Sequence, residues 1–145
     1  MLLPFSHTIR FELDTPDGVA EWGANVPGNG LAYLGESKHP FTVAMMHELR
    51  CLDIIRDTVV SDTSTEESST LARHCLNYVR QSIFCRADTH LESVQYPNTA
   101  HPVDIESVYE CKDWGAVYDA VKQSQEEYAP WYAQFRANTG TSPSS

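Results

Sequence analysis

Two segments of the sequence place a histidine beside a cysteine or one helical turn from it. His47 precedes Cys51 by four positions, and His74 stands directly before Cys75. Residues at positions i and i+4 share one face of a helix. Two histidines and two cysteines suit a tetrahedral zinc site or a soft-ligand copper site. The pattern therefore predicts either a metal centre or a disulfide-stapled pair of helices, with histidines that are merely packed or solvent-facing in the second case.

Helices are the elements expected to position these residues. Apolar residues recur at spacings of three and four after Pro40, which predicts a helix from there. Its expected core stripe is Phe41, Met45, Leu49, Leu52, Ile55 and Val59, and the neighbouring face carries His47, Arg50, Cys51 and Ile54. A second helix is expected from about Ser69 to Phe84. One side of it carries Leu71, His74, Cys75, Tyr78 and Ser82, and Leu76, Val79 and Ile83 lie on another, which predicts a central helix.

The N-terminal part of the chain reads as short strands and turns. Every second residue from Phe5 to Leu13 is apolar except His7, and the residues between them are polar. This alternation predicts a half-buried strand with His7 on its inner face. A turn is expected over 14–18, then a short helical turn over 19–25 that carries Trp22. A second turn at 27–30 leads into a short apolar stretch, 31–34.

The C-terminal part is expected to contain loops and further helices. Residues 86–110 contain Pro97 and Pro102 and predict loops with a short hairpin. Asp113 can cap a third helix whose core stripe is Trp114, Val117, Tyr118 and Val121. A short aromatic helix is expected from Pro130, before a flexible tail over 140–145. The expected fold is a small α+β domain over 1–139, with central helices that carry the His/Cys motifs and short N-terminal and loop-derived strands.

Composition and charge exclude several classes of partner. The chain has 145 residues, enough for one domain, and its hydrophobic content of 41% is typical of globular proteins. The net charge of −10 leaves no basic stripe for nucleic acid or anionic lipid. Four cysteines allow two disulfides, but no pair has the CxxC spacing. No apolar run approaches the roughly 20 residues of a membrane helix, and the N-terminus does not resemble a signal peptide.

Other histidines offer weaker candidate sites. His90 lies between Asp88 and Glu92, an arrangement that fits either an acid–base cluster or a polar loop. His101 precedes Pro102 and is expected in a surface loop. The sequence contains no nucleophile elbow, P-loop, dinucleotide-binding glycine motif or HExxH motif.

The order of the His/Cys motifs resembles the UstYa-like oxidases of fungal natural-product clusters. The resemblance rests on three runs, His47 to Arg56, His74 to Glu92 and Cys111 to Trp114. Two stretches near the N-terminus, Pro4 to Ser6 and Trp22 to Gly30, also fit the expected start of this family. The resemblance therefore covers nearly the whole chain. The resemblance implies a role in the biosynthesis of mycotoxins and cyclic ribosomal peptides. Members of the family perform oxidative cyclisation, and some hydroxylate or halogenate.

The family pattern has two HxxHC motifs, thought to hold copper, and this chain departs from both. Arg50 occupies the second histidine position of the first motif, and Leu71 occupies the first histidine position of the second. Tyr109 stands where a later His-x-Cys motif has its histidine. Arginine stays protonated and leucine has no ligand atom. The resemblance therefore implies a copper site reduced to His47 and His74, with Tyr109 or His90 nearby.

Three functions remain open on this interpretation. A metal-dependent oxidoreductase would use copper held by His47 and His74 to modify or cyclise a peptide or other natural-product precursor. A cofactor-free cyclase or dehydratase would orient its substrate with Arg50 and move protons with the histidines. A non-catalytic chain would stabilise an active paralogue.

The resemblance also implies a compartment and partners. Members carry an N-terminal membrane anchor and face the secretory lumen, and this chain begins about where that anchor would end. We therefore expect a luminal or membrane-associated protein, with a soluble intracellular form as the alternative. The expected partners are a small-molecule or peptide precursor and a second family chain, in a homodimer or heterodimer. In an oxidising lumen all four cysteines would be paired, tying the second helix to its flanking loops, and three connectivities are open.

Overall fold

The computed structural model describes residues 1–5, 8–61, 65–94, 103 and 108–139. The α-helices within these residues are α1 (Pro16–Ala24), α2 (Ala44–Val60), α3 (Glu66–Arg86) and α4 (Trp114–Thr139), and a 3-10 turn, η1, spans Pro27–Gly30. The strands are β1 (Leu2–Pro4), β2 (Leu31–Leu34), β3 (His39–Thr42) and β4 (Val108–Glu110). Helices with a few short antiparallel strands confirm the expected small α+β domain. The expected tail, 140–145, lies outside the described residues, as do His7, His101 and the two prolines of the later loop.

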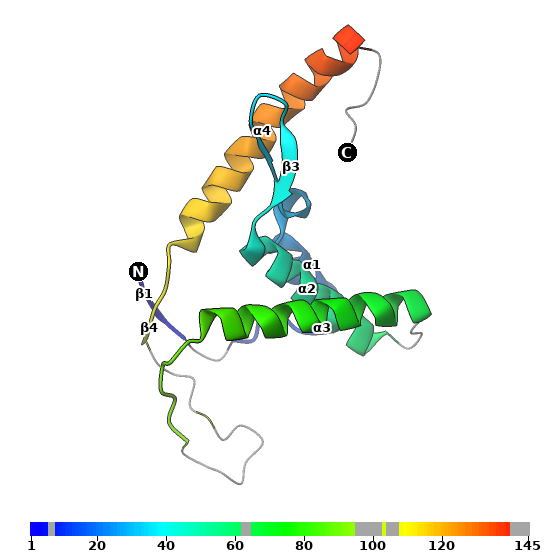
Figure 1. Ribbon diagram of the computed structural model, residues 1–145. Coiled ribbons are helices and arrows are strands. Elements are labelled where there is room, and N and C mark those ends of the chain that lie inside the picture. Colours follow the sequence, from blue (N-terminus) through cyan, green and yellow to red (C-terminus); the bar gives the residue numbers. More distant parts are fainter. Residues whose placement is uncertain (6–7, 62–64, 95–102, 104–107, 140–145) are drawn as a thin grey trace.

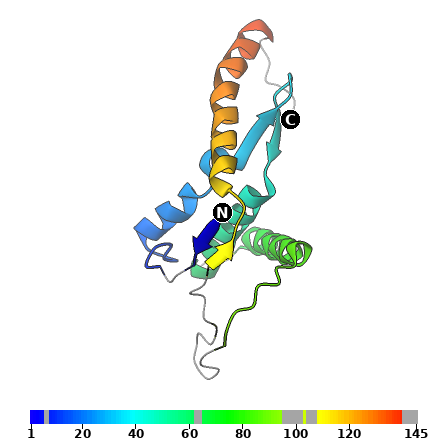
Figure 2. The ribbon, with the colours of Figure 1, turned by 90° about the vertical axis from the view of Figure 1, so that its left-hand side faces the viewer.

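The helices form two groups that diverge from a common region (Figure 1). Helices α2 and α3 pack side by side, and an ion pair of 3.0 Å joins Glu48 near the start of α2 to Arg86 at the end of α3, so the two run antiparallel. Helix α4 extends away from this pair, and the β2–β3 hairpin lies along it in both views (Figures 1 and 2). Strands β1 and β4 pair next to the start of α4. The α2–α3 pair is therefore one unit, and α4 with its hairpin is a second.

The hydrophobic core lies where the start of α2, strand β2 and α4 meet. Met46, Ala32 and Val121 are buried there, with the partly buried Val26, Val43, Met45, Val117 and Tyr118 around them. Three of the four residues expected for the core stripe of α4 are thus confirmed, whereas Trp114 is half-exposed. The stripe expected for the first helix is wrong in part, because Phe41 belongs to β3 and both Leu52 and Val59 are exposed. The residues of α2 that are buried are Met46, Cys51 and Arg56.

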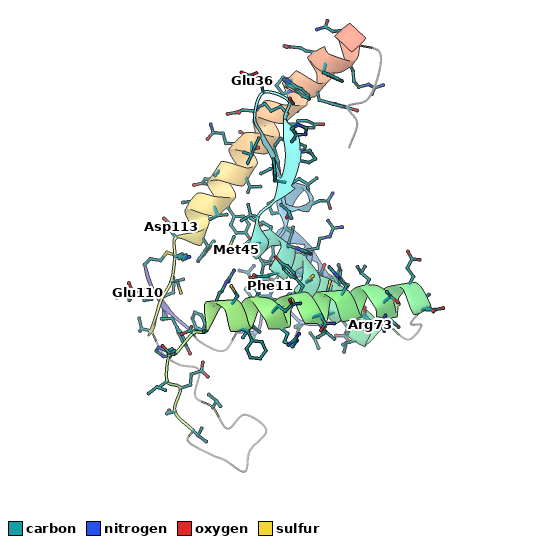
Figure 3. The ribbon with its side chains drawn as sticks, viewed as in Figure 1. Phe11, Glu36, Met45, Arg73, Glu110 and Asp113 are labelled. Atoms are coloured by element: carbon teal, nitrogen blue, oxygen red, sulfur yellow. The ribbon has the colours of Figure 1, made fainter. Side chains whose placement is uncertain are left out.

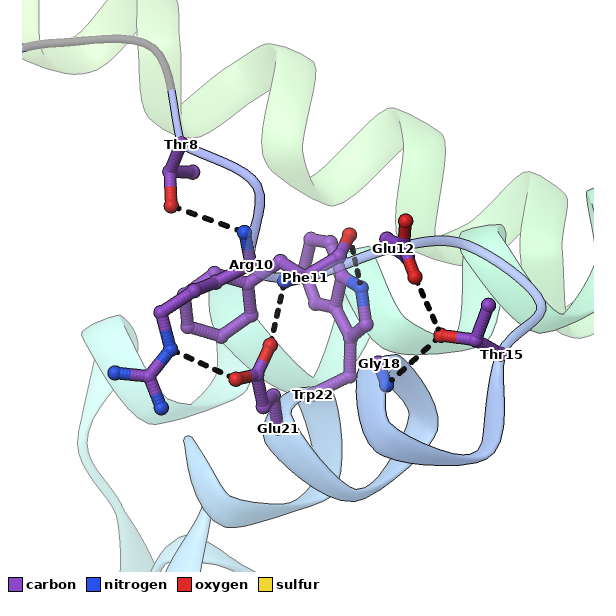
Figure 4. Close-up of polar contacts among 8 residues, drawn as sticks. All are labelled: Thr8, Arg10, Phe11, Glu12, Thr15, Gly18, Glu21 and Trp22. Carbon is purple, nitrogen blue, oxygen red and sulfur yellow. Dashed lines mark hydrogen bonds and ion pairs between the residues drawn. The ribbon is translucent and has the colours of Figure 1, made fainter.

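The segment before α1 is held by polar contacts instead of strand pairing (Figure 4). Glu21 accepts the backbone N–H of Phe11 at 2.6 Å and the Arg10 guanidinium at 2.7 Å. Both donors lower the pKa of the Glu21 carboxyl, and the backbone N–H of Phe11 has the larger effect. Phe11 has a φ of 62°, which a strand does not accommodate. The strand expected over residues 5–13 is therefore wrong, because strand β1 ends at Pro4.

Helix α3 begins with a capping box and is longer than expected. The Thr65 hydroxyl accepts the backbone N–H of Ser68 at 3.1 Å, and the Ser68 hydroxyl accepts the N–H of Thr65 at 2.9 Å. The sequence had predicted that this helix is central, and that prediction is wrong. Only Ala72 and Cys75 are buried, while its large apolar residues Leu71, Leu76, Ile83 and Phe84 are 46–72% exposed. Helix α2 covers one side of α3 alone, so the apolar residues on its other sides stay in contact with solvent.

Helix α4 continues without a break from Trp114 to Thr139. Asp113 accepts the backbone N–H of Ala116 at 3.2 Å, which confirms the expected cap. Pro130 lies inside this helix, so the separate aromatic helix expected from that residue is wrong. Aromatic rings from Tyr128 onward stack along α4 and on Tyr33 of β2. Among the described residues, no helix is long and apolar enough to cross a bilayer.

Candidate functional site

The two cysteines of the His/Cys motifs face each other between α2 and α3. Cys51 and Cys75 are each only 1% exposed. Burial, followed by the neighbouring Cys75 side chain, raises the pKa of the Cys51 thiol to about 12. In the reduced protein Cys51 is therefore a thiol and not a thiolate at neutral pH. Both cysteines are packed between the two helices.

The two histidines lie together at the rim of the same interface. The ring centroids of His47 on α2 and His74 on α3 are 6.1 Å apart, with the ring planes inclined by 26°. His47 is half-buried and His74 is exposed. The pairing follows from the antiparallel packing, because Cys51 and Cys75 are both buried between the two helices and each histidine stands close to its cysteine in sequence. The structure thus confirms that the two motifs converge, one on each helix.

Tyr78 is a third member of this cluster, which we call the histidine rim (His47, His74 and Tyr78). Its ring stacks on His47 with a centroid distance of 4.0 Å. Tyr78 follows His74 by one helical turn, so both side chains project from the same side of α3 (Figure 3, where Arg73 marks this part of the helix). The sequence placed Tyr78 on this side of the helix but indicated no role for it. Only the packing of α2 against α3 revealed its contact with His47.

A shallow depression of about 640 Å³ opens beside the histidine rim. His74 lines it together with Leu71, Thr70, Glu66 and Glu67, all from the first half of α3. Two carboxylates next to an imidazole make this surface acidic. An apolar side chain, a hydroxyl and two carboxylates thus surround the exposed imidazole of His74.

Arg50 does not join the histidine rim. Its guanidinium donates to the side-chain oxygen of Asn29 at 3.3 Å. It lines a separate pocket of about 270 Å³ together with Trp22, Asp53 and Ile54, among others. His47 and His74 are not among the residues that line this pocket in the described structure. In the described structure Arg50 therefore contacts η1, and the structure does not bring it together with His47 and His74.

Tyr109 and His90 form a cluster of their own. The Tyr109 hydroxyl donates to Glu92 at 2.6 Å, and the His90 ring lies 4.2 Å from the Tyr109 ring. Phe5 stacks on the same tyrosine at 4.0 Å. These contacts tie the segment after α3 to strands β1 and β4. The expectation that Tyr109 or His90 joins the two histidines is not supported by any contact in the described structure, which instead pairs Tyr109 and His90 with each other.

The two imidazoles can be tested against the geometry that a metal ion requires. A metal–imidazole bond of about 2.0 Å places the ion roughly 3.1 Å from the ring centroid, so two imidazoles on one ion have centroids roughly 5 Å apart at a tetrahedral angle and at most roughly 6.3 Å apart when they lie on opposite sides of the ion. The separation of 6.1 Å between His47 and His74 is close to that upper limit. No group of three or more His, Cys, Asp or Glu side chains in the described part of the chain is arranged to hold an ion. As placed, the two imidazoles therefore fit a shared ion only from opposite sides of it, and further ligands would come from solvent, substrate or a partner.

Comparison with known proteins places the chain in context. A family model described as "Mycotoxin biosynthesis protein UstYa" matches residues 6–131. A hydroxylase, cctR of Talaromyces islandicus, is 26% identical over 99 residues, which cover 64% of this chain and 37% of the relative. The chain thus spans less than two fifths of the length of that relative. No solved structure matches the chain.

Proposed function

This chain belongs to the UstYa family of mycotoxin-biosynthesis proteins, and from that membership we propose that it performs an oxidative step on a fungal secondary-metabolite precursor. The step is either a hydroxylation or an oxidative ring closure. The description of the relative as a hydroxylase supports the first choice. The precursor is a peptide or another small natural product. The observation that carries the proposal is the convergence of His47 and His74 at an open, acidic depression.

The residues of the histidine rim have distinct roles in this proposal. His74 is exposed and lines the depression, so it meets the substrate and can accept or donate a proton there. His47 is half-buried and is held by Tyr78, which restricts the orientation of its ring. Glu66 and Glu67 attract a basic group of the precursor and bring its reacting carbon toward His74.

We further propose copper as the metal, held by His47 and His74. Imidazole is a common ligand of copper in proteins, and two rings 6.1 Å apart can share an ion that lies between them. Bound copper would supply the redox chemistry that neither imidazole nor carboxylate can perform. The remaining coordination positions would be open to oxygen and substrate, as catalytic metal sites require.

The absence of a third ligand in the described part of the chain favours a second candidate function. In this alternative the chain is a cofactor-free cyclase or dehydratase, and His47 and His74 move protons without a metal. Arg50 takes no part at the histidine rim, because its guanidinium lies against Asn29. A non-catalytic chain that supports an active paralogue is the remaining alternative, and it predicts that neither histidine matters for product formation.

The compartment and partners belong to the same proposal. We propose that the chain works in the secretory lumen, where oxidation of its cysteines is favoured. A second family chain, identical or paralogous, would pack against it and offer the additional ligands that the two imidazoles lack. The limited core of the described residues, with many large apolar side chains left exposed, supports such a partner.

The histidines provide the decisive test of function. We would replace the gene in a producing strain with His47→Ala or His74→Ala and follow the precursor and product by mass spectrometry. Loss of a group that transfers protons or binds the metal should lower product formation roughly 10²-fold or more. His39→Ala is the matched control, since His39 is exposed on β3 and belongs to the hairpin unit. Parent-level product from both histidine variants, with the protein folded, would overturn a histidine-centred enzyme.

Metal content separates the two enzymatic candidates. The purified protein would be loaded with copper, desalted and analysed by elemental mass spectrometry. Near-stoichiometric copper that is lost in His47→Ala and His74→Ala, but not in His39→Ala, supports the oxidase. Product formation that survives removal of all metal by a chelator supports the cofactor-free alternative. A gain of one oxygen atom in the product would identify hydroxylation, and a loss of two hydrogen atoms would identify ring closure.

A further inference from the structure

Cys51 and Cys75 are buried thiols for which the proposed oxidative step has no use. They come from different helices and from segments separated by the α2–α3 connection, and each is 1% exposed. Helices α2 and α3 pack against each other, so the two buried side chains lie in one interface. Cys75 is close enough to Cys51 to raise the pKa of its thiol.

We propose that Cys51 and Cys75 form a disulfide that links α2 to α3 directly beneath the histidine rim. Two thiols lose two protons and two electrons as one S–S bond forms. The electrons pass to a disulfide oxidant of the secretory pathway, a small-molecule or protein disulfide, whose own S–S bond breaks to give two thiols. The inference rests on the luminal compartment proposed above, but it does not depend on any catalytic activity.

Geometry favours this pair over the other connectivities. A disulfide requires two cysteines that lie close together, and Cys51 and Cys75 are both buried between the packed helices α2 and α3, where the Cys75 side chain raises the pKa of the Cys51 thiol. Cys85, by contrast, is exposed in the last turn of α3. Cys111 follows β4, where its backbone N–H and C=O both bond to Met1. The expectation that the cysteines tie the second helix to its flanking loops is thereby replaced, for this pair, by a link between the two helices.

The disulfide would also position the two histidines. Cys75 is the immediate neighbour of His74, and Cys51 lies one helical turn after His47. A covalent link at this level fixes how α3 can slide or rotate against α2. Because the histidine rim takes one side chain from each helix, the separation of its two rings depends on that register. The disulfide is thus a positioning element for the site and not a redox participant in the reaction.

Trypsin offers a direct test, because each cysteine falls in a different peptide. Cleavage after Arg50, Arg56, Arg73, Arg80 and Arg86 separates Cys51 (51–56), Cys75 (74–80) and Cys85 (81–86), and Cys111 remains in 87–112. The full chain would be secreted from a eukaryotic host, quenched in acid with an alkylating agent and digested without reductant. We expect peptides 51–56 and 74–80 to appear as one linked species. Alkylated free Cys51 and Cys75, or a link from either to Cys85 or Cys111, would overturn the proposal.

Refolding in vitro tests whether Cys51 pairs with Cys75 independently of whether the chain works in the secretory lumen. The reduced full chain would be refolded with oxidised and reduced glutathione and mapped in the same way. The 51–56 to 74–80 link should form there as well. If it forms in vitro but the chain in its own host carries alkylatable thiols, the luminal compartment is wrong and the pairing holds. If the protein refolds correctly but both thiols stay free, the proposed disulfide does not form and the proposal is wrong.

Thermal unfolding provides a readout with matched variants. Cys51→Ala, Cys75→Ala and the double variant remove the link, whereas Cys85→Ala removes an exposed thiol from the same helix. Loss of a native disulfide that closes a loop of this length should lower the Tm by roughly 10 °C. Reductant should lower the Tm of the parent and of Cys85→Ala by a similar amount but leave the double variant unchanged. Equal sensitivity of the double variant to reductant would contradict the assignment.

Discussion

At the scale of single residues, the α2–α3 interface separates two kinds of side chain that the sequence places close together. The cysteines point into the interface and are almost fully buried, while the histidines lie at its rim. One position along a helix turns a side chain by about 100°, which is enough to move it from a buried face to an exposed one. This explains how the neighbours His74 and Cys75 have different environments, Cys75 buried in the interface and His74 exposed at its rim.

The pKa of Cys51 leads to a prediction for the reduced protein. Its pKa is raised from 9.0 to about 12, a difference of three units, so its thiolate fraction at pH 8 falls about 1,000-fold. Alkylation of folded, reduced protein should therefore be slower at Cys51 than at exposed Cys85 by a factor of that order. The rates would be measured by timed quenching and mass spectrometry. Comparable rates at the two thiols would contradict the burial of Cys51.

The raised pKa of Cys51 also makes the free energy of unfolding depend on pH, and it falls as the pH rises above 9. The folded state keeps the Cys51 proton up to about pH 12, whereas the unfolded chain releases it near pH 9.0. The stabilisation is therefore complete below pH 9 and is lost as the pH rises toward 12. In reduced protein, Cys51→Ala should remove this contribution to the alkaline loss of stability. Denaturant unfolding of parent and variant at a series of pH values above 9 would measure it.

Tyr78 is predicted to act through the ring that it stacks on His47. Tyr78→Phe keeps the ring and should retain most activity and copper binding. Tyr78→Ala removes the stacking contact, which is worth about 1 kcal/mol in aromatic pairs, and should lower activity or copper affinity about 5-fold or more. Activity and copper titration of both variants would test this. Equal losses in both would assign the role to the hydroxyl instead of the ring.

At the scale of elements, α1 is defined by local contacts at its start. The Thr15 hydroxyl accepts the backbone N–H of Gly18 at 3.2 Å and donates to Glu12 at 2.9 Å (Figure 4). This cap draws the preceding segment over the first turn of α1. As a result the backbone of Glu12 lies so close to Gly18 that a Cβ there would stand 2.2 Å from the Glu12 carbonyl oxygen.

Two glycines of α1 therefore respond oppositely to the same substitution. Gly18→Ala forces the Glu12 backbone to move and should destabilise the protein by roughly 1–3 kcal/mol. Gly23→Ala meets nothing within 4 Å and should stabilise it by up to about 1 kcal/mol, because alanine favours the helix. Free energies of unfolding from denaturant titration would be compared with the parent. A stable Gly18→Ala protein would show that the segment 8–15 does not cover α1.

At the scale of the whole molecule, α4 and its hairpin are joined by polar contacts between distant segments. The Ser124 hydroxyl accepts the backbone N–H of Tyr33 at 2.7 Å and donates to the Tyr33 carbonyl at 3.0 Å. Gln125 donates to the carbonyls of Pro27 and Leu31, and Tyr118 donates to the carbonyl of Asn25. Strand β2 pairs with β3 on one side alone, so α4 satisfies backbone groups that the small sheet leaves unpaired.

Removing one of these contacts should loosen α4. Ser124→Ala leaves both backbone groups of Tyr33 without their partner and should cost about 1–3 kcal/mol of unfolding free energy. Lys122→Ala on the same helix is the matched control, since its side chain is exposed and its ion pair with Glu126 is 4.0 Å long. Hydrogen exchange should show faster exchange of the Tyr33 amide in Ser124→Ala. Parent-like exchange at Tyr33 would argue against the bridge.

Local sequence signals determined much of the fold. The two His/Cys helices, the turn at 27–30, the cap at Asp113 and the stripe that includes Val121 were all predicted, because helical periodicity and capping depend on nearby residues. The family was also evident from the order of the motifs, and the matching family model confirms it. The same patterns failed for residues 5–13 and for Pro130, where contacts with α1 and the continuity of α4 override local preference.

Only the tertiary structure decided which residues of the motifs meet. Sequence spacing put Arg50 on the same face of α2 as His47, yet its long side chain reaches Asn29 in η1. Tyr78 joined the site because α2 packs against that side of α3, and both cysteines proved to be buried in the same interface. Which side chains touch depends on the register and rotation of the two helices. Periodicity gives the face of each helix, whereas packing decides what that face contacts.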